Sequence, residues 1–404
     1  MSVYIYDAGR TPFGRHAGVL AGVRPDDLLG GLISQLIKRN PFDLIDYEDV
    51  VAGCASQAGE DARNVARHAA LLAGLPVQVG GLTVNRLCGS GLAAILDAAR
   101  AIRCEEGDLF LAGGVESMSR APFVVGKADA AFSRKFEVFD SSIGARFPNS
   151  LIEKQFGSDT MPETADNVAR QLGISRDDCD AFALRSQIHY SQALAAGHFE
   201  SEVLAVQIQH KKKPPVLIEQ DEHPRPDTTL ESLSRLMPLY EGGVVTPGNA
   251  SGINDGAAAV IMGNSSVGQR HGMRPRARLL AGAVAGVEPR LMGLGPVNAI
   301  KKALLRAGLK LSDMDVIEIN EAFAAQVLGC TRSLGLADDD PRLNPKGGAI
   351  ALGHPLGASG ARLVTTALHF LEQTGGRFAL VSLCIGLGQG IACVLERCES
   401  HNKN

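Results

Sequence analysis

The chain has 404 residues, of which 45% are hydrophobic and 21% are charged. This length is enough for two domains with cores of their own. Its 40 basic and 44 acidic side chains give a formal net charge of −4, so the balance indicates no nucleic-acid or anionic-membrane partner. The composition, with 46 glycines and no tryptophan, excludes a disordered chain, a collagen-like repeat, a coiled coil and a membrane span.

The N-terminus and the cysteines indicate the compartment. The first residues enter an alternating apolar run at once, without the features of a secretory signal or a transit peptide. The eight cysteines are scattered and form no C-x-x-C pair: Cys54, Cys88, Cys104, Cys179, Cys330, Cys384, Cys393 and Cys398. Scattered cysteines in a chain of this size argue for reduced thiols, and against a disulfide framework or structural zinc. We expect a cytoplasmic protein with no metal site.

Short β-branched runs alternate with helical patterns along most of the chain, which predicts an α/β fold. In chain order, the patterns predict a strand over residues 3–7, helices over 26–39 and 91–103, a strand over 109–112, a helix over 297–307, a strand over 316–320, a helix over 360–373 and a strand over 378–383.

Residues 121–249 break this regularity with proline, charge and turn signals around one helical stretch, residues 162–196. We interpret them as a region inserted over a more regular core, and predict four segments: 1–120, 121–249, 250–273 and 274–404. The run Lys211-Lys212-Lys213 could contact phosphate, but a solvated loop is the simpler interpretation.

The core shows signs of an internal repeat. Ser90-Gly91 and Ser359-Gly360 each open a helical pattern, and the strand that follows starts 17 residues after the glycine in both cases, at Asp108 and at Arg377. Both copies also place reactive residues in the turn before the helix. Two related α/β halves are therefore predicted, each with a helix N-terminus that offers free N–H groups beside those residues.

Cys88 is the candidate nucleophile. It lies in the segment Val84-Asn85-Arg86-Leu87-Cys88-Gly89-Ser90-Gly91, between an apolar strand and a helix start. A thiol in a strand-to-helix turn meets amide donors that favour its thiolate. The alternative is a buried core cysteine, but Gly89 and Gly91 indicate a close backbone approach.

His354 is the candidate base. It is held between Gly353 and Pro355 just before a helix start, which is a poor place for a core side chain, and it could take the proton of a nearby thiol. The alternative is a loop histidine with ordinary hydrogen bonds.

Two further strand ends carry polar or reactive side chains. Cys384 opens the segment Cys384-Ile385-Gly386-Leu387-Gly388-Gln389-Gly390, whose glycines suit close approach of a substrate to the backbone. Asn320 ends the strand before it and is expected on the same face, whereas Glu321 is interpreted as structural. A metal site is disfavoured because metal-ligand spacings are absent, and no G-x-G-x-x-G or P-loop supports a nucleotide site.

Four motifs in order carry a resemblance to the thiolase family: Asn-Arg-Leu-Cys-Gly-Ser-Gly, Asn-Glu-Ala-Phe-Ala, Gly-His-Pro-Leu-Gly-Ala-Ser-Gly and Cys-Ile-Gly-x-Gly. The likeness runs from Arg10-Thr11-Pro12-Phe13-Gly14 to the last of these motifs, essentially the whole chain. It implies an α/β thiolase fold, with duplicated βαβαβαββ halves in a five-layer αβαβα core and an inserted loop domain. It also implies a homo-oligomer, a tetramer or a dimer, and acyl-CoA and CoA as substrates, with no bound cofactor.

The resemblance also implies a role for each site residue. Cys88 would be acylated, His354 would activate it, and Cys384 would move a proton at the acetyl α-carbon or on the leaving carbanion. Asn320 would hold a water in one oxyanion hole, beside His354, and the N–H groups of Cys88 and Gly386 would form the other. The expected CoA contacts are Thr160, Met161, Arg225, Ser232, Ser251, Ala322 and Phe323.

Further segments, such as 113–123, 126–134 and 161–169, resemble the β-ketoadipyl-CoA branch of the family, which cleaves 3-oxoadipyl-CoA to succinyl-CoA and acetyl-CoA. One departure is Ala145, where that branch is expected to carry tryptophan. The alternatives are an acetoacetyl-CoA thiolase, a general fatty-acid 3-ketoacyl-CoA thiolase and an inactive thiolase-like binding protein. The free carboxylate of 3-oxoadipyl-CoA needs a partner once it is desolvated. We predict Arg146 or Arg134 in that role, because both stand beside phenylalanines.

Overall fold

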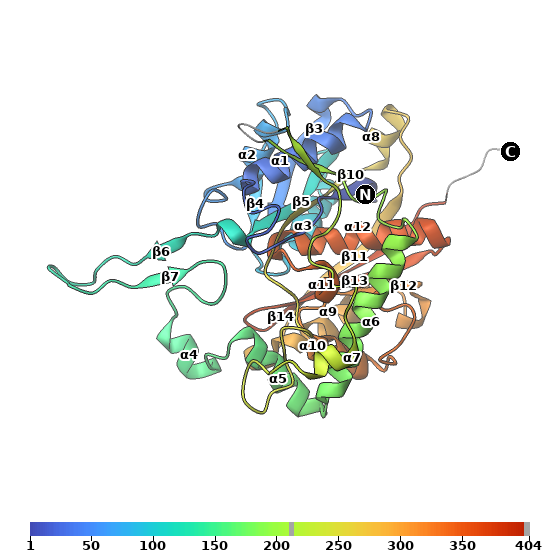
Figure 1. Cartoon of the computed structure of the whole chain (residues 1–404). Helices are drawn as coiled ribbons and strands as arrows, with labels where there is room; N and C mark the ends of the chain where they lie inside the picture. The colour runs from blue at the N-terminus through green and yellow to red at the C-terminus, as the bar shows by residue number, and fades with distance from the viewer. Residues whose placement is uncertain (210–213, 400–404) are drawn as a thin grey trace.

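The computed structural model of the chain describes residues 1–209 and 214–399, so the triple lysine lies outside the described residues. Its central element is a ten-stranded sheet, in the order β12-β13-β14-β11-β1-β10-β5-β3-β4, with β2 paired to β10 (Figure 1). The strands are β1 (Tyr4–Arg10), β2 (Gly14–Arg15), β3 (Tyr47–Gly53), β4 (Leu82–Val84), β5 (Leu109–Ser117), β10 (Asn254–Gly263), β11 (Ala277–Gly286), β12 (Val316–Ile319), β13 (Phe378–Ile385) and β14 (Gln389–Arg397).

The sheet consists of two halves with the same pattern of strand directions. In the first half β1, β10 and β5 pair antiparallel, and β3 then pairs parallel to β5. In the second half β11, β14 and β13 pair antiparallel, and β12 pairs parallel to β13. The halves meet where Tyr4 of β1 pairs with Arg278 of β11, and Ile5 with Ala277. This correspondence agrees with the predicted duplication.

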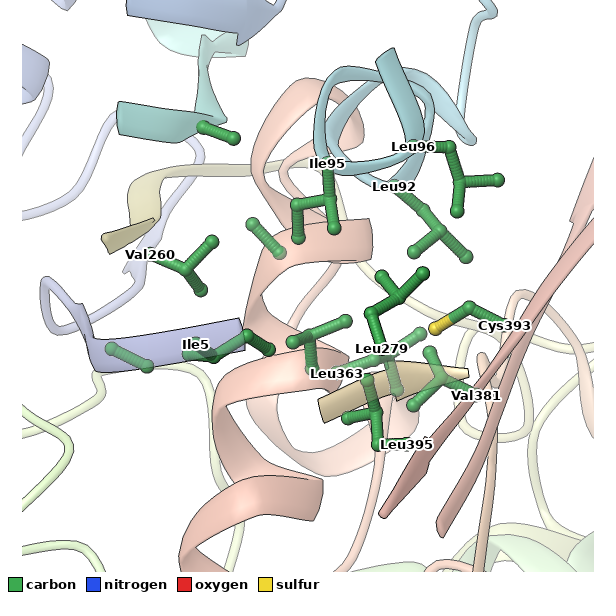
Figure 2. Close-up of a cluster of buried hydrophobic side chains, with 14 of the residues drawn as sticks. Ile5, Leu92, Ile95, Leu96, Val260, Leu279, Leu363, Val381, Cys393 and Leu395 are labelled. Carbon is green, nitrogen blue, oxygen red and sulfur yellow. The ribbon is translucent and has the colours of Figure 1, made fainter. Parts of the chain in front are cut away.

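Helices lie between and outside the two halves, which gives five layers. Figure 1 shows α3 and α12 in the middle of the molecule, and side chains of both share one core cluster with strands of both halves (Figure 2). α1 and α2 cover the outer face of the first half, whereas α9 and α10 cover that of the second. The helices of the core are α1 (Pro25–Lys38), α2 (Val65–Leu72), α3 (Ser90–Arg103), α8 (Ser265–Arg270), α9 (Gly295–Ala307), α10 (Ala324–Leu334), α11 (Ala349–Leu352) and α12 (Leu356–Thr374), with short 3-10 turns at Leu44–Asp46, Met118–Arg120, Pro289–Leu294 and Leu311–Asp313.

The two central helices approach each other through glycines. A Cβ placed on Gly91 of α3 would lie 2.5 Å from the carbonyl oxygen of Gly357 in α12, and one on Gly360 would lie 2.2 Å from the backbone nitrogen of Leu92. Real Cβ atoms do not tolerate such distances, so only glycine allows this contact. The predicted close backbone approach at Gly91 is therefore the packing of α3 on α12.

The inserted region comprises β6 (Phe123–Val125), β7 (Val138–Asp140), α4 (Ser150–Phe156), α5 (Met161–Leu172), α6 (Arg176–Ala195), β8 (Val206–Ile208), β9 (Val216–Ile218) and α7 (Leu230–Ser234). The β6–β7 hairpin projects away from the body of the molecule (Figure 1). Within the described residues, no helix combines the length and the hydropathy needed to cross a membrane.

The structure corrects two predicted helices. The stretch 162–196 is two helices, because Gly173 adopts a left-handed φ of 63° that ends α5, and Ser175 caps the start of α6. The helix predicted from residue 360 begins at Leu356, directly after Pro355. Proline fixes a φ suited to a helix entry, so the chain turns into α12 earlier than the apolar pattern indicates.

Candidate active site

Cys88 lies in the tight turn from β4 into α3. Leu87 takes a left-handed φ of 47°, and the turn closes with hydrogen bonds from the Gly89 N–H to the Arg86 carbonyl (3.0 Å) and from the Ser90 N–H to the Leu87 carbonyl (3.0 Å). A non-glycine residue in this conformation is strained and persists only where its surroundings hold it. The turn therefore holds Cys88 in one defined position at the start of α3.

The sulfur of Cys88 faces the hairpin between β13 and β14. It accepts hydrogen bonds from the backbone N–H groups of Gly386 and of Cys88 itself. Cys384, at the end of β13, is buried and close enough that the charge of the Cys88 thiolate raises its pKa. Two thiols and two convergent N–H donors thus meet at one point. Such a pair of donors is suited to a developing oxyanion.

His354 lies between α11 and α12, and three groups fix its position. Its backbone N–H donates to Asn254 Oδ1 (2.9 Å), its Nδ1 lies 2.6 Å from Ser359 Oγ, and its Nε2 lies 3.3 Å from Asn320 Nδ2. The Ser359 hydroxyl donates its one proton to the Pro355 carbonyl (2.9 Å), so Nδ1 is the donor to Ser359. Nε2 is then unprotonated and accepts from the Asn320 amide, which is the state that a base requires.

Asn320 and Cys384 are placed by neighbouring parallel strands. β12 and β13 run in parallel, and the Asn320 N–H donates to the carbonyl of Ser382 (2.9 Å), two residues before Cys384. The Asn320 side chain is fully buried. The carboxyl ends of the two strands therefore carry Asn320 and Cys384 to one edge of the second half.

The packing of α3 on α12 brings Cys88 and His354, the candidate nucleophile and the candidate base, toward each other. Cys88 stands three residues before Gly91, His354 stands three residues before Gly357, and Gly91 contacts the Gly357 carbonyl. Because both residues precede the helix starts that touch, the turns that carry them lie side by side. The duplicated strand–helix unit thus supplies one reactive residue from each half.

Burial keeps these groups neutral in the resting site. It raises the pKa of the Cys88 thiol to about 11, although the Gly386 N–H opposes this, and it raises the pKa of Cys384 well above its ordinary value. Burial, reinforced by the positive charge of Arg362, lowers the pKa of His354 to about 3. A standing thiolate–imidazolium pair is therefore disfavoured in the resting site.

Most residues expected to contact CoA lie around the cysteines. Ala322 and Phe323 are buried in one cluster with Cys384, and the Ser251 N–H donates to the Ala322 carbonyl (2.9 Å). Met161 opens α5 beside Gly386, where a Cβ on that glycine would lie 3.5 Å from its sulfur.

The other three residues expected to contact CoA have no direct contact with the two cysteines among the hydrogen bonds of the described residues. Thr160 caps α5, and its Oγ1 lies 2.8 Å from the hydroxyl oxygen of Tyr240. Arg225 and Ser232 are exposed farther along the inserted region. Arg225 donates its N–H to Gln187 of α6 (3.0 Å), and Ser232 belongs to α7, so no contact among the described residues joins these two to Cys88 or Cys384.

Several groups that shape the site have no predicted role from the sequence. Ser359 and Asn254 fix His354, and only Ser359 carried a signal, because it lies in the same motif five residues on. Glu321, interpreted as structural, accepts from Ser186 Oγ (2.6 Å) and Asn344 Nδ2 (2.8 Å), which agrees with that interpretation.

Comparisons with known proteins define the family. The model of the thiolase N-terminal domain matches residues 3–266, and that of the thiolase C-terminal domain matches residues 273–397. The chain belongs to the thiolase family, a family of acyltransferases, and its structure is the thiolase fold.

Individual relatives are similar along nearly the whole chain. The sequence is 59% identical to a β-ketoadipyl-CoA thiolase of Escherichia coli over 396 residues, which covers 98% of this chain and 99% of the relative. It is 58% identical to a β-ketoadipyl-CoA thiolase of Acinetobacter baylyi with the same coverage. Among solved structures, the Bacillus anthracis acetyl-CoA acetyltransferase has a TM-score of 0.92 at 36% identity, covering 98% of this chain and 99% of its own. Human mitochondrial 3-ketoacyl-CoA thiolase in complex with CoA has a TM-score of 0.91 at 39% identity, covering 98% of each chain.

Proposed function

We propose that this protein catalyses the reversible cleavage of 3-oxoadipyl-CoA by CoA, which yields succinyl-CoA and acetyl-CoA through an acyl-Cys88 intermediate. The observation that carries the reaction type is the meeting of Cys88, Cys384 and the Gly386 N–H at the β13–β14 hairpin, with His354 on the adjoining turn. CoA enters as a substrate, and the proposal needs no resident cofactor or metal.

The neutral groups of the site suggest the order of proton transfers. The Cys88 sulfur attacks the 3-oxo carbon while His354 Nε2 takes the thiol proton. The bond between C2 and C3 then breaks, and the acetyl-CoA carbanion takes the proton of Cys384. In the second half-reaction, CoA attacks the acyl thioester, its thiol proton goes to the Cys384 thiolate, and His354 returns its proton to Cys88.

Two sets of donors would stabilise the oxyanions of these steps. The N–H groups of Cys88 and Gly386, which bond the Cys88 sulfur, would face the thioester carbonyl of the acyl-enzyme. Asn320, beside His354, would serve the enolate of acetyl-CoA. Each well-placed donor contributes about 3–4 kcal/mol to such a transition state.

Two observations support the dicarboxylate substrate. Relatives with 56–59% identity include several that are named β-ketoadipyl-CoA thiolases and one that is named 3-oxoadipyl-CoA/3-oxo-5,6-dehydrosuberyl-CoA thiolase, whereas the acetyl-CoA acetyltransferase structure is only 36% identical. Arg146 is half-buried and donates from Nη2 to the carbonyl of Ser56 (3.0 Å). The preceding residue, Ala55, accepts a hydrogen bond at its carbonyl from Asn85 in the Cys88 turn (3.1 Å). The Arg146 guanidinium therefore contacts the same loop that is bonded to the Cys88 turn.

Steady-state thiolysis of three substrates tests the proposal. We expect kcat/KM for 3-oxoadipyl-CoA to exceed the values for acetoacetyl-CoA and for a long-chain 3-ketoacyl-CoA by at least about tenfold. A preference for acetoacetyl-CoA or for the long chain would replace this substrate assignment by the corresponding alternative, and no thiolysis of any substrate would overturn the proposed activity.

We further propose that the protein is a cytoplasmic homo-oligomer, a tetramer or a dimer. The β6–β7 hairpin carries exposed large apolar side chains at Phe123, Val125, Phe132, Phe136 and Val138, which a contact between subunits would cover. All eight cysteines are free, which suits a reducing compartment. Light scattering after gel filtration tests the assembly: a multiple of the 42.5 kDa chain mass is expected, and a monomer would contradict it.

A further inference from the structure

Glu116 is a buried carboxylate near the end of β5 that accepts three backbone N–H groups. Its Oε2 lies 2.9 Å from the nitrogens of both Ala55 and Gly357, and its Oε1 lies 2.9 Å from the nitrogen of Ser56. Charge-assisted bonds of this kind are stronger than neutral ones. A side chain outside the expected catalytic set thus accepts hydrogen bonds from the backbone of the loop after β3 and from the start of α12.

The three donors belong to the two halves of the molecule. Ala55 and Ser56 follow β3 in the first half, whereas Gly357 is the second residue of α12 in the second half. The backbones touch there, since a Cβ on Gly357 would lie 2.6 Å from the carbonyl oxygen of Gly53. Glu116 therefore bridges the boundary between the halves.

Each side of this bridge leads to a reactive residue. On the first side, Asn85 Nδ2 donates to the Ala55 carbonyl (3.1 Å) and Asn85 Oδ1 accepts from the Leu87 N–H (2.9 Å), next to Cys88. On the second side, Gly357 lies three residues after His354, in the helix whose Ser359 holds the imidazole.

We propose that Glu116 is a positioning residue of the thiolase reaction: by joining the loop behind Cys88 to the start of α12, it fixes the nucleophile relative to the base. It acts through backbone N–H groups and touches no substrate. The inference rests on the proposed function, because the roles of Cys88 and His354 come from it.

The groups that face Glu116 define its pH response. The Cys54 thiol lies 3.7 Å from its Oε1 and 3.4 Å from Asp61, Cys88 interacts with its charge, and α12 presents the uncharged Gly357 amide. On the neighbouring strand β10, Asp255 instead bonds the Ser119 N–H (2.9 Å). Burial raises the pKa of Glu116 to about 7, so acid protonates it and places an O–H against an N–H donor. Turnover is therefore expected to fall as the pH drops through about 7.

The test compares E116Q with D255N. Glutamine keeps the size of the side chain but turns an amide N–H against one of the three donors. Asp255→Asn removes a buried carboxylate from the next strand without touching α12, so it is the matched control for loss of a buried charge. For thiolysis of acetoacetyl-CoA, kcat of E116Q should fall about 30-fold while KM for CoA stays within about threefold. D255N should retain kcat within about threefold, and the acid limb near pH 7 should be absent from E116Q only.

Other outcomes of this comparison would overturn the inference or the proposed function. Equal losses in E116Q and D255N, or a wild-type pH profile in E116Q, would overturn the inference. If E116Q does not fold, E116D, which keeps the charge, should fold and recover the acid limb; failure of both to fold while D255N folds would show that Glu116 is needed only for stability. Rapid acetylation of wild-type Cys88 by acetyl-CoA is measured alongside, because its absence would refute the proposed function itself rather than the role of Glu116.

Discussion

His354, two residues before α12, and Ser359, in the first turn of that helix, form a contact of 2.6 Å between imidazole Nδ1 and hydroxyl Oγ. The hydroxyl proton is committed to the Pro355 carbonyl, so this contact holds the imidazole in the tautomer with a free Nε2. The same contact sets the orientation of the ring. The helix that follows His354 thus carries the group that orients its imidazole.

Removing this hydroxyl should reduce the rate without reducing binding. In Ser359→Ala, Nδ1 loses its acceptor, so the ring can turn and change tautomer, and kcat for thiolysis should fall about 10- to 100-fold. Thr365→Val is the matched control, because Thr365 lies on the same helix and its hydroxyl only bonds the Ala361 carbonyl (2.9 Å). Equal kcat values for the two variants would show that Ser359 does not orient the base.

Because His354 is neutral in the folded protein, the free energy of unfolding should depend on pH. Its pKa is about 3 in the folded state, below the ordinary 6.5, so its contribution to the free energy of unfolding is fully present above about pH 6.5 and is lost as the pH falls toward 3. His354→Asn lacks this titration. The free energy of unfolding of the wild type minus that of the variant should therefore decrease by about 1.4 kcal/mol per pH unit between about pH 6 and 4. Urea unfolding at several pH values measures it, and a constant difference would contradict the neutral imidazole.

The glycine contact between the central helices predicts a large loss of stability. Gly91→Ala places a methyl group 2.5 Å from the Gly357 carbonyl oxygen, so the free energy of unfolding should fall by about 1–3 kcal/mol or more. Gly31→Ala is the control, since it lies in α1 with nothing within 4 Å of the added Cβ, and alanine there should stabilise by about 0.5–1 kcal/mol. Similar shifts of the thermal midpoint in both variants would refute the packing of α3 on α12.

Arg146 should determine specificity for a substrate with a terminal carboxylate. Arg146→Met should lower kcat/KM for 3-oxoadipyl-CoA by at least about tenfold, because the buried carboxylate then lacks a charged partner, with little change for acetoacetyl-CoA. Arg134→Met is the control on the exposed hairpin. Equal losses on both substrates would make Arg146 structural, and a loss confined to Arg134→Met would move the role to that residue.

The sequence predicts the parts of this site that depend on local pattern. The turn of Cys88, the strand ends of Asn320 and Cys384, and the duplication all follow from apolar periodicity and glycine spacing, because such signals are short in range. The prediction of one helical stretch over residues 162–196 was wrong at Gly173, since a single glycine is compatible with a helical pattern until its left-handed φ is known.

The parts that depend on tertiary contact could not be predicted in this way. Glu116 accepts from residues 55, 56 and 357, and no local pattern connects positions so far apart. The projection of the β6–β7 hairpin away from the body of the molecule likewise follows from no local pattern in the sequence.

The most direct test of the central claim is mass spectrometry of the protein after brief exposure to acetyl-CoA. We predict that one acetyl group, a mass increase of about 42 Da, is attached to Cys88 as a thioester, and that added CoA removes it. Cys384→Ala should still be acetylated at Cys88, because a CoA thiolate can leave without a proton from the protein. The variant should lose turnover and exchange of the acetyl-CoA α-protons, because the carbanion exchanges its proton with Cys384. An adduct confined to another cysteine, or an adduct on Cys88 that CoA cannot remove, would contradict the account.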